Sequence, residues 1–561
     1  MTSPPPDRSS LRITASADDA ATIEALTARA ADERVPQRLW DRDDTLWGPA
    51  GQPEVVDRLA WLDAPATTRQ LHGELTALTD AIAAEGYTDV LLVGMGGSSL
   101  APAVICSADP QAPRRLRMLD STDPDAIASV DAATDPDRTL VLVATKSGGT
   151  LETISLFRHF WSRRPEGAAF VAVTDPGSGL EALAERHGFR AIFRADPEIG
   201  GRYSALSAFG AVPAALIGLD HDALLAGGQA GLDAAHADVP DNAAVRLGAA
   251  IAALAGAGRD KLVVRVQDPQ LGNFSLWLEQ LVAESTGKHG IGVLPVVEDP
   301  GAEITVRDLT GPDRQLLVIR GSQPDQGLDD EIATASASGV PVLELVLDHD
   351  PERASPLAQL GWAFATTEVA VAVAGWGLAI NPFNQPDVQA AKDATQVVLT
   401  SLSAGEPLED ADDATADAIA AFASGLRAPG YLSLLAYVPP SPAGAAAIER
   451  LRAVLARSTD AAITSGFGPR YLHSTGQLHK GGPAGGRFLI LEHEPRATRA
   501  IPADADAPHP TDSFADLIRA QAQGDERTLA DHDRAVLRLS LGTDWLERLD
   551  EIVNHLEGRS S

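Results

Sequence analysis

Short apolar runs alternate with helical patterns along most of the chain. In the first half the runs are Asp89–Val93, Leu116–Leu119, Thr139–Ala144, Ala169–Val173 and Ala191–Phe193. A second series comprises Lys261–Val266, Ile291–Val297, Gln315–Gly321 and Val340–Leu347. Helical patterns separate the runs, among them 151–162, 178–187, 242–256, 272–286 and 328–337. Strands that alternate with helices predict parallel sheets with helices on both faces, whose ligands lie beyond the carboxyl ends of the strands.

The rest of the pattern predicts additional segments at both ends of these α/β units. Residues 1–63 carry one helical pattern and are expected to wrap around a core that they do not themselves form. We therefore expect domains at 64–230 and 231–401, followed by a C-terminal α/β and helical extension at 402–561. Within the extension, 464–483 is poor in aliphatic residues and rich in Gly, His, Ser and Thr, which is typical of a long functional or disordered loop.

Composition limits the classes of partner. The 561 residues include 78 acidic and 45 basic side chains, a formal charge of −33, which argues against nucleic acid and anionic membranes because both need a basic face. Cys106 is the only cysteine, so an intramolecular disulfide and a CxxC site are excluded. Met1–Ser10 lack the apolar core of a secretion signal, and the apolar run 368–380 is too short to span a membrane. A cytoplasmic protein is expected.

The stretch Val141–Thr153 carries the strongest chemical signal. Its apolar run ends in Thr145-Lys146-Ser147-Gly148-Gly149-Thr150, and a helical pattern begins directly afterwards. Free backbone N–H groups and the helix dipole make such a junction suited to a phosphate. The alternative is an ordinary strand-to-helix turn in which Thr150 caps the helix. A second glycine-rich turn, Gly94–Leu100, follows the first strand of the same predicted sheet, so both loops can hold one ligand.

Three further segments place ionisable or amide side chains where a ligand could be reached. Arg202 follows a Gly-Gly pair, whose backbone can pass close to a ligand, although it could also be a surface loop arginine. Gln280 and Glu284 share a helix face close to the Gly287 stop, although a solvated Glu is the simpler interpretation. A corner with two prolines, Asn381–Asp387, contains Gln385, and Lys392 follows Gln385 by seven residues, which is about two helical turns.

Histidines in the segment 464–483 are the remaining candidates. His473 and His479 are six residues apart, and the sequence offers no evident third ligand, so a metal is not expected there.

Taken together, these segments resemble the phosphoglucose isomerase (glucose-6-phosphate isomerase) family, which is built from two sugar-isomerase (SIS) domains. The likeness covers roughly residues 64–393 and depends on five motifs in the family's order: Gly94–Leu100, Thr145–Thr153, Gly200–Ser204, Glu284–Lys288 and Asn381–Lys392. The resemblance implies an α/β fold of two SIS domains with parallel sheets flanked by helices, plus the C-terminal extension. It implies substrate contacts from Ser98, Thr145, Lys146, Ser147, Thr150, Gln280 and Gln385.

The sequence departs from the family's motifs at several positions. Gly148-Gly149 replaces Phe-Thr in the phosphate loop, and Thr286 replaces an Asn. The family's ring-opening histidine has no counterpart in its usual interval, where His289 and His349 lie in unlike surroundings. A similar string, Gln477-Leu-His-Lys-Gly-Gly482, appears later. Residues 466–483 and the helical C-terminus look like the isomerase half of bacterial transaldolase/phosphoglucose isomerase fusions, so a free-standing version of that half is expected.

The resemblance implies reversible isomerisation of glucose 6-phosphate and fructose 6-phosphate through an enediolate, in glycolysis and gluconeogenesis. Glu284 would be the base, Arg202 would face the enediolate, and Lys392 with His479, or its rival His473, would open the ring. No cofactor or metal is required, and a homodimer with its site at the subunit interface is expected. The alternatives are a non-catalytic sugar-phosphate sensor and an isomerase that also accepts mannose 6-phosphate.

Overall fold

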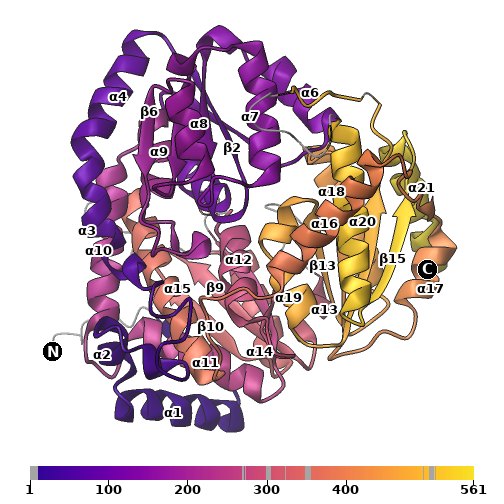
Figure 1. Cartoon of the computed structure of the whole chain (residues 1–561). Coiled ribbons are helices and arrows are strands. Elements are labelled where there is room, and N and C mark those ends of the chain that lie inside the picture. Colours follow the sequence, from indigo (N-terminus) through magenta and orange to yellow (C-terminus); the bar gives the residue numbers. More distant parts are fainter. Residues whose placement is uncertain are drawn as a thin grey trace.

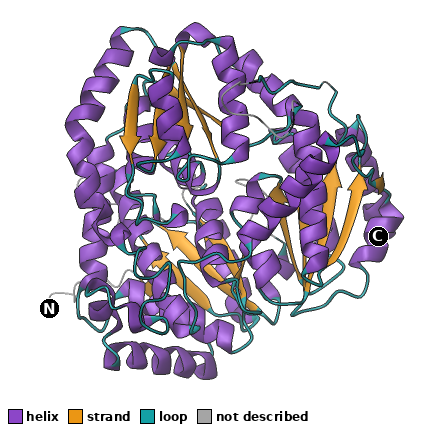
Figure 2. Cartoon of the chain, viewed as in Figure 1, coloured by secondary structure: helices purple, strands orange, loops and turns teal. Residues whose placement is uncertain are grey.

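The computed structural model describes residues 11–267, 271, 273–297, 305–321, 324–347, 355–496, 498–503, 511 and 513–560. Two subjects of the sequence-based expectations, Met1–Ser10 and His349, lie outside these described residues. The described chain forms three five-stranded sheets, each flanked by helices (Figures 1 and 2).

The first sheet has the strand order β3-β2-β4-β5-β6, and all its strands are parallel. Its strands are β2 (Asp89–Gly94), β3 (Arg115–Leu119), β4 (Thr139–Ala144), β5 (Phe170–Thr174) and β6 (Ala191–Arg194). The accompanying helices are α3 (Ala64–Thr68), α4 (His72–Ala84), α5 (Leu100–Ser107), α6 (Pro124–Ala133), α7 (Leu151–Arg163), α8 (Gly179–Arg186), α9 (Ala208–Ile217) and α10 (His221–His236). β2 and β4 are buried along their whole length, which explains their continuous apolar runs.

The second sheet has the order β1-β10-β9-β7-β8 and recruits the N-terminal segment. Its strands are β1 (Leu11–Thr14), β7 (Lys261–Val266), β8 (Leu294–Val296), β9 (Arg314–Arg320) and β10 (Val342–Val346). Its helices are α1 (Ala17–Asp32), α2 (Val35–Trp40), α11 (Ala243–Gly256), α12 (Phe274–Thr286), α13 (Val306–Thr310), α14 (Gln326–Ala337) and α15 (Pro356–Gly377). β1 pairs antiparallel with β10 at the sheet edge, a strand that the sequence pattern did not reveal.

The third sheet has the order β11-β15-β14-β12-β13 and is parallel throughout. Its strands are β11 (Asp412–Asp413), β12 (Tyr431–Tyr437), β13 (Ala462–Phe467), β14 (Gly486–Glu492) and β15 (Ala535–Ser540). Its helices are α16 (Val388–Ser403), α17 (Ala416–Ala423), α18 (Pro442–Ala456), α19 (Gly476–Gly481), α20 (Phe514–Asp531) and α21 (Trp545–Ser560).

The prediction that 464–483 is a long loop is wrong. Its first residues belong to β13, and the remainder forms a 3₁₀ turn, η9 (Arg470–His473), followed by α19. Most of α19 is buried, and its polar side chains have hydrogen-bond partners there. Lys480 Nζ donates to Asp525 Oδ1 at 2.6 Å, and both side chains are 1% exposed. The hydroxyl of Tyr471 also donates to Asp525, at 2.5 Å.

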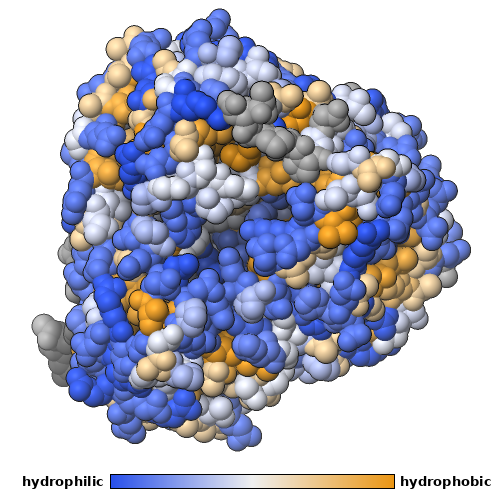
Figure 3. Space-filling model, viewed as in Figure 1, coloured by the Kyte–Doolittle hydropathy of each residue, from blue (hydrophilic) through white to orange (hydrophobic). Residues whose placement is uncertain are grey.

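Each sheet together with its helices is called a unit below. α15 is the longest helix of the second unit and lies inside the protein. Among the described residues it alone is long and apolar enough to cross a membrane, although 89% of its apolar window is buried within the protein. It packs against α10, α11 and α12, which accounts for its apolar residues on all sides. The face of the molecule in Figure 3 is mostly hydrophilic, in keeping with the high net charge.

The buried Lys480–Asp525 pair predicts a large loss of stability on Asp525→Ala. Removing one partner leaves an unpaired buried ammonium, which should destabilise the protein by about 3–5 kcal/mol and lower the thermal midpoint. The control is Asp410→Ala, which breaks the exposed ion pair with Arg519 and should leave the midpoint almost unchanged. Equal midpoints for the two variants in calorimetry would contradict this assignment.

Candidate active site

Two glycine-rich turns meet at the carboxyl ends of neighbouring strands, as the sequence predicts. β2 and β4 are paired, with Gly94 opposite Ala144. The turn after β2 forms a 3₁₀ helix, η4 (Gly96–Ser98), against the Gly201–Tyr203 turn, η7. A Cβ on Gly97 would lie 2.0 Å from the backbone oxygen of Gly201, so only glycine allows this approach. The packing brings Ser98 and Arg202 into the same region.

The loop after β4 divides its polar side chains between two directions. Ser147 and Thr150 line a cavity, and the hydroxyls of Thr145 and Thr150 lie 2.7 Å apart. Thr150 occupies the N-cap position of α7, but its side chain makes no capping hydrogen bond. Lys146 instead pairs with Asp175 and donates to the carbonyl oxygen of Pro197 at 2.9 Å. The lysine thus ties this loop to the loops after β5 and β6.

Arg202 and Glu284 form the centre of a buried cluster. Arg202 is 3% exposed and Glu284 is 4% exposed, and Arg202 Nη1 lies 3.4 Å from Glu284 Oε2. Arg202 also donates through Nε to Ser285 Oγ at 2.8 Å and through Nη2 to the carbonyl oxygen of Pro382 at 2.6 Å. Its Nη1 lies 3.4 Å from Gln385 Oε1. The predicted Arg202, Glu284 and Gln385 therefore lie together.

Opposing effects act on the pKa of the Glu284 carboxyl group. Burial raises its pKa above the ordinary value, while the charges of Arg202 and His473 and a hydrogen bond from Gln280 lower it in part. Gln280 Nε2 lies 3.4 Å from Glu284 Oε2 and donates to the backbone oxygen of His473 at 2.8 Å. Gln280 thus connects the carboxylate to the histidine-bearing turn.

Lys288 holds the corner that carries Gln385. Its Nζ donates to the backbone oxygens of Asn381 and Asn384, at 2.7 and 2.6 Å, and to Asn384 Oδ1 at 2.9 Å. Burial lowers the pKa of this amine well below its ordinary value. On the other side of the corner, Gln477 of α19 donates to Asp387 Oδ2 at 2.6 Å. The corner is therefore fixed from both the second and the third sheets.

His473 contacts Glu152, which in turn binds Gln521, and sequence reasoning selected neither of these two residues. His473 Nε2 lies 3.2 Å from Glu152 Oε1, and Gln521 Nε2 donates to the same oxygen at 2.8 Å. Burial raises the pKa of Glu152, but the charge and hydrogen bond of His473, with the charge of Lys392, lower it more, so the net shift is downward. Glu152 belongs to the motif Thr145–Thr153, so the sequence contained a signal that could have identified it. Gln521 lies on α20, far along the chain, and belongs to no motif that the sequence analysis found.

His479, for which the family resemblance implies ring opening, lies in the protein core. It is 1% exposed and lies in the third unit, where its ring faces those of Tyr431 and Phe488. Burial, together with the charges of Lys480 and Arg534, lowers its pKa well below the ordinary histidine value. His479 therefore lies on the face of α19 that packs into the core. The rival, His473, lies at the cavity.

A cavity of about 320 Å³ joins the phosphate loop to the third unit. Its walls include Ser147, Gly149, Thr150, Glu152, Lys392, His473 and Gln521. Lys392 is exposed, on α16.

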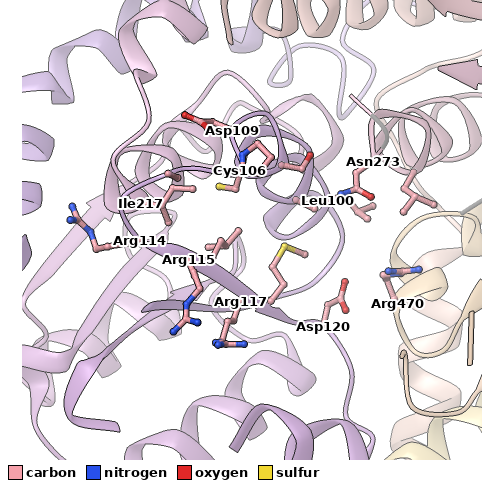
Figure 4. A pocket seen from close by; sticks show the side chains of 17 residues that line it. Leu100, Cys106, Asp109, Arg114, Arg115, Arg117, Asp120, Ile217, Asn273 and Arg470 are labelled. Carbon is pink, nitrogen blue, oxygen red and sulfur yellow. The ribbon is translucent and has the colours of Figure 1, made fainter. Parts of the chain in front are cut away.

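A larger cavity, of about 520 Å³, lies between α5, β3, α12 and η9 (Figure 4). It is lined by Cys106, Arg117, Asp120 and Arg470, among others, and contains none of the predicted site residues. Burial raises the pKa of the Cys106 thiol, which favours its inert form. Among the described residues, groups of His and carboxylate side chains able to hold a metal lie outside the 320 Å³ cavity.

Comparisons with known proteins relate the chain to one family. The family model for phosphoglucose isomerase matches residues 73–305. The chain is 31% identical over 389 residues to the glucose-6-phosphate isomerase of Rubrobacter xylanophilus, covering 61% of this chain and 89% of that protein. It is 32% identical over 450 residues to that of Thermosynechococcus vestitus, covering 71% and 81%.

Solved structures with the same fold include a hypothetical protein from Thermus thermophilus, with a TM-score of 0.57 and 27% identity, covering 69% of this chain and 99% of that one. A glucose-6-phosphate isomerase from Chlamydia trachomatis also has a TM-score of 0.57, with 21% identity, covering 71% of this chain and 90% of that one, and this likeness concerns the fold alone. The extent of the sequence matches shows that the chain belongs to the glucose-6-phosphate isomerase family.

Proposed function

We propose that this protein is an enzyme that interconverts glucose 6-phosphate and fructose 6-phosphate through an enediolate. The carrying observation is the buried pair of Glu284 and Arg202, connected by Gln280 to a turn whose His473 lines a cavity beside the phosphate loop. A sugar-phosphate sensor would need the loop but not a buried carboxylate–guanidinium pair. Isomerase chemistry gives each of these groups a task.

Glu284 is the base that moves a proton between C2 and C1. Its buried position raises its pKa, and a carboxylate with a raised pKa is a better base for a carbon acid. Arg202 opposes the effect of burial on this pKa and so favours the ionised form. The same carboxyl group can then return the proton to the adjacent carbon.

Arg202 stabilises the negative charge that develops on the enediolate oxygens. Its guanidinium is held by Ser285 and by the backbone of Pro382, so little reorganisation is needed when the charge appears. Gln280 and Gln385 flank the same pair and are placed to orient substrate hydroxyls.

His473 opens the sugar ring, with Lys392 at the cavity wall as its partner. Glu152 accepts a hydrogen bond from Nε2 of His473, which orients the imidazole. Nδ1 of the imidazole is then left to exchange a proton with the ring oxygen of the sugar. Gln521 holds the carboxylate of Glu152 in turn. The roles expected of His479 thus pass to His473.

The phosphate group is held by Ser98, Thr145, Ser147 and Thr150, with backbone N–H groups at the start of α7. Lys146 contributes by fixing the loop through Asp175. These local groups act against a formal charge of −33, so the field that attracts the anionic substrate is short-ranged. A homodimer remains a prediction from the family resemblance.

Glu284→Gln tests the proposed base. The amide keeps the shape of the side chain but cannot accept the carbon-bound proton, so turnover should fall about 10²–10⁴-fold while fructose 6-phosphate still binds. Coupled assays and calorimetric binding measure the two quantities. The control is Glu24→Gln, an exposed residue of α1, which should turn over like the wild type. Near wild-type turnover of Glu284→Gln would remove this residue from the mechanism.

His473→Asn and His479→Asn separate the two histidines. Loss of His473 removes the proposed ring-opening acid, so kcat should fall about 10²-fold or more. The thermal midpoint should fall less than in His479→Asn, because Glu152 keeps its hydrogen bond from Gln521. His479→Asn should instead lower the thermal midpoint, since the side chain is buried among aromatic rings. The reverse pattern in paired activity and melting measurements would restore His479 as the ring-opening residue.

The double variant Ser147→Ala, Thr150→Val tests the phosphate loop. Losing two hydroxyl donors should raise KM about tenfold or more and change kcat little, because the phosphate remains bound alike in the ground and transition states. Inhibition by inorganic phosphate should weaken in parallel. The matched change Ser162→Ala, at the far end of α7, should leave both constants unchanged. An unaltered KM in the double variant would rule out these hydroxyls as phosphate ligands.

A further inference from the structure

Two histidines and an aspartate converge where α4 and α10 begin. His72 is the first residue of α4, and His221 and Asp222 are the first two residues of α10. One ligand atom from each of the three side chains lies within 4.8 Å of the others. α3, α4 and α10 run along one edge of the molecule (Figure 1), away from the cavity that contains His473.

The His221 ring is arranged as a metal-binding imidazole. The residue is 8% exposed, and its Nε2 is buried without a hydrogen-bond partner. With its proton on Nδ1, an imidazole presents a lone pair at Nε2, which is the form that binds a metal ion.

His72 and Asp222 complete the group on its solvent side. His72 Nδ1 lies 2.6 Å from Asp222 Oδ2, and His221 Nε2 lies 4.0 Å from Asp222 Oδ1. The two imidazole rings are tilted by 32°, with centroids 5.5 Å apart. The side chains of His72 and Asp222 are 54% and 45% exposed, so an ion can reach the group from solvent.

The local charge suits a cation. Asp220 and Asp222 place two carboxylates on either side of His221 in the sequence, at the start of α10. Asp220 is occupied as the cap of α10, where its Oδ1 accepts from the Ala223 N–H at 3.0 Å. The positive end of the α10 dipole is therefore offset by one capping and one ligating carboxylate.

We propose that His72, His221 and Asp222 bind one divalent transition-metal ion of the zinc class. Two imidazole nitrogens and one carboxylate oxygen suit Zn²⁺, and a water would complete a tetrahedron on the exposed side. The ion would join the start of α4 to the start of α10. Because α10 packs on α15 and α3, the expected consequence is added stability of the first unit. The site shares no residue with the proposed isomerase site.

Zinc titration of the chelator-treated full-length protein tests this site. We expect one Zn²⁺ per chain by calorimetry and metal analysis, and a higher thermal midpoint with Zn²⁺ than without. Loss of an outer-shell partner lowers metal affinity about 10–100-fold. In His72→Ala and Asp222→Asn a direct ligand is lost, so the affinity for Zn²⁺ should fall further than that. Both side chains are partly exposed, so these variants should remain folded. Co²⁺ should give the intense visible bands of tetrahedral coordination only when all three ligands are present.

Two matched variants locate any zinc that binds. His555→Ala alters an exposed histidine on α21 and should bind Zn²⁺ like the wild type. Asp125→Asn alters a second group, Asp123, Asp125 and His493, and should also leave binding unchanged. Absence of stoichiometric binding, equal affinity in His72→Ala, or loss of binding only in Asp125→Asn would overturn the proposal. Isomerase turnover of His72→Ala should match the wild type, so the two proposals fail independently.

Discussion

The burial of Arg202 beside Glu284 is the constraint on which the site depends. A guanidinium removed from water needs acceptors for its N–H groups. Those of Arg202 are Glu284 and Ser285 on α12 and the carbonyl oxygen of Pro382 in the corner 381–387. Those segments are held in turn by Lys288, which donates to Asn381 and Asn384. Moving either segment would remove part of the hydrogen bonding of a buried charge. The cluster is therefore rigid, as an electrostatic stabiliser must be.

The third sheet supplies both a wall of the cavity and the fixings of the other two units. His473 faces Glu152 of the first unit, and Gln477 holds Asp387 at the corner. At another contact His493 Nε2 lies 2.5 Å from Asp123 Oδ2, with both side chains almost fully buried. α16 and α20 pack together and carry Lys392 and Gln521 to the cavity. A single chain thereby encloses the phosphate loop and the histidine that faces it.

Local patterns predicted most strands and helices well because their causes are local. β4 has the predicted bounds Thr139–Ala144, and α7 follows directly after the glycine-rich loop. Gly97 and Gly148 mark close backbone approaches that no other residue allows, and both stand in motifs that the sequence singled out. β1 escaped notice because a strand of four residues at a sheet edge is defined by its partner, β10, and not by its own pattern.

The sequence alone determined the α/β class, the two glycine-rich turns and the candidates Arg202, Gln280 and Glu284. These features depend on motifs and apolar patterns formed by residues that are close together in the sequence. Only the tertiary structure decided which histidine faces the cavity and where Lys146 points. His473 and His479 are similar in sequence context, yet one meets Glu152 and the other packs between aromatic rings. Lys146 finds Asp175 from a neighbouring loop. Such choices depend on partners distant along the chain, which only folding brings within hydrogen-bonding reach.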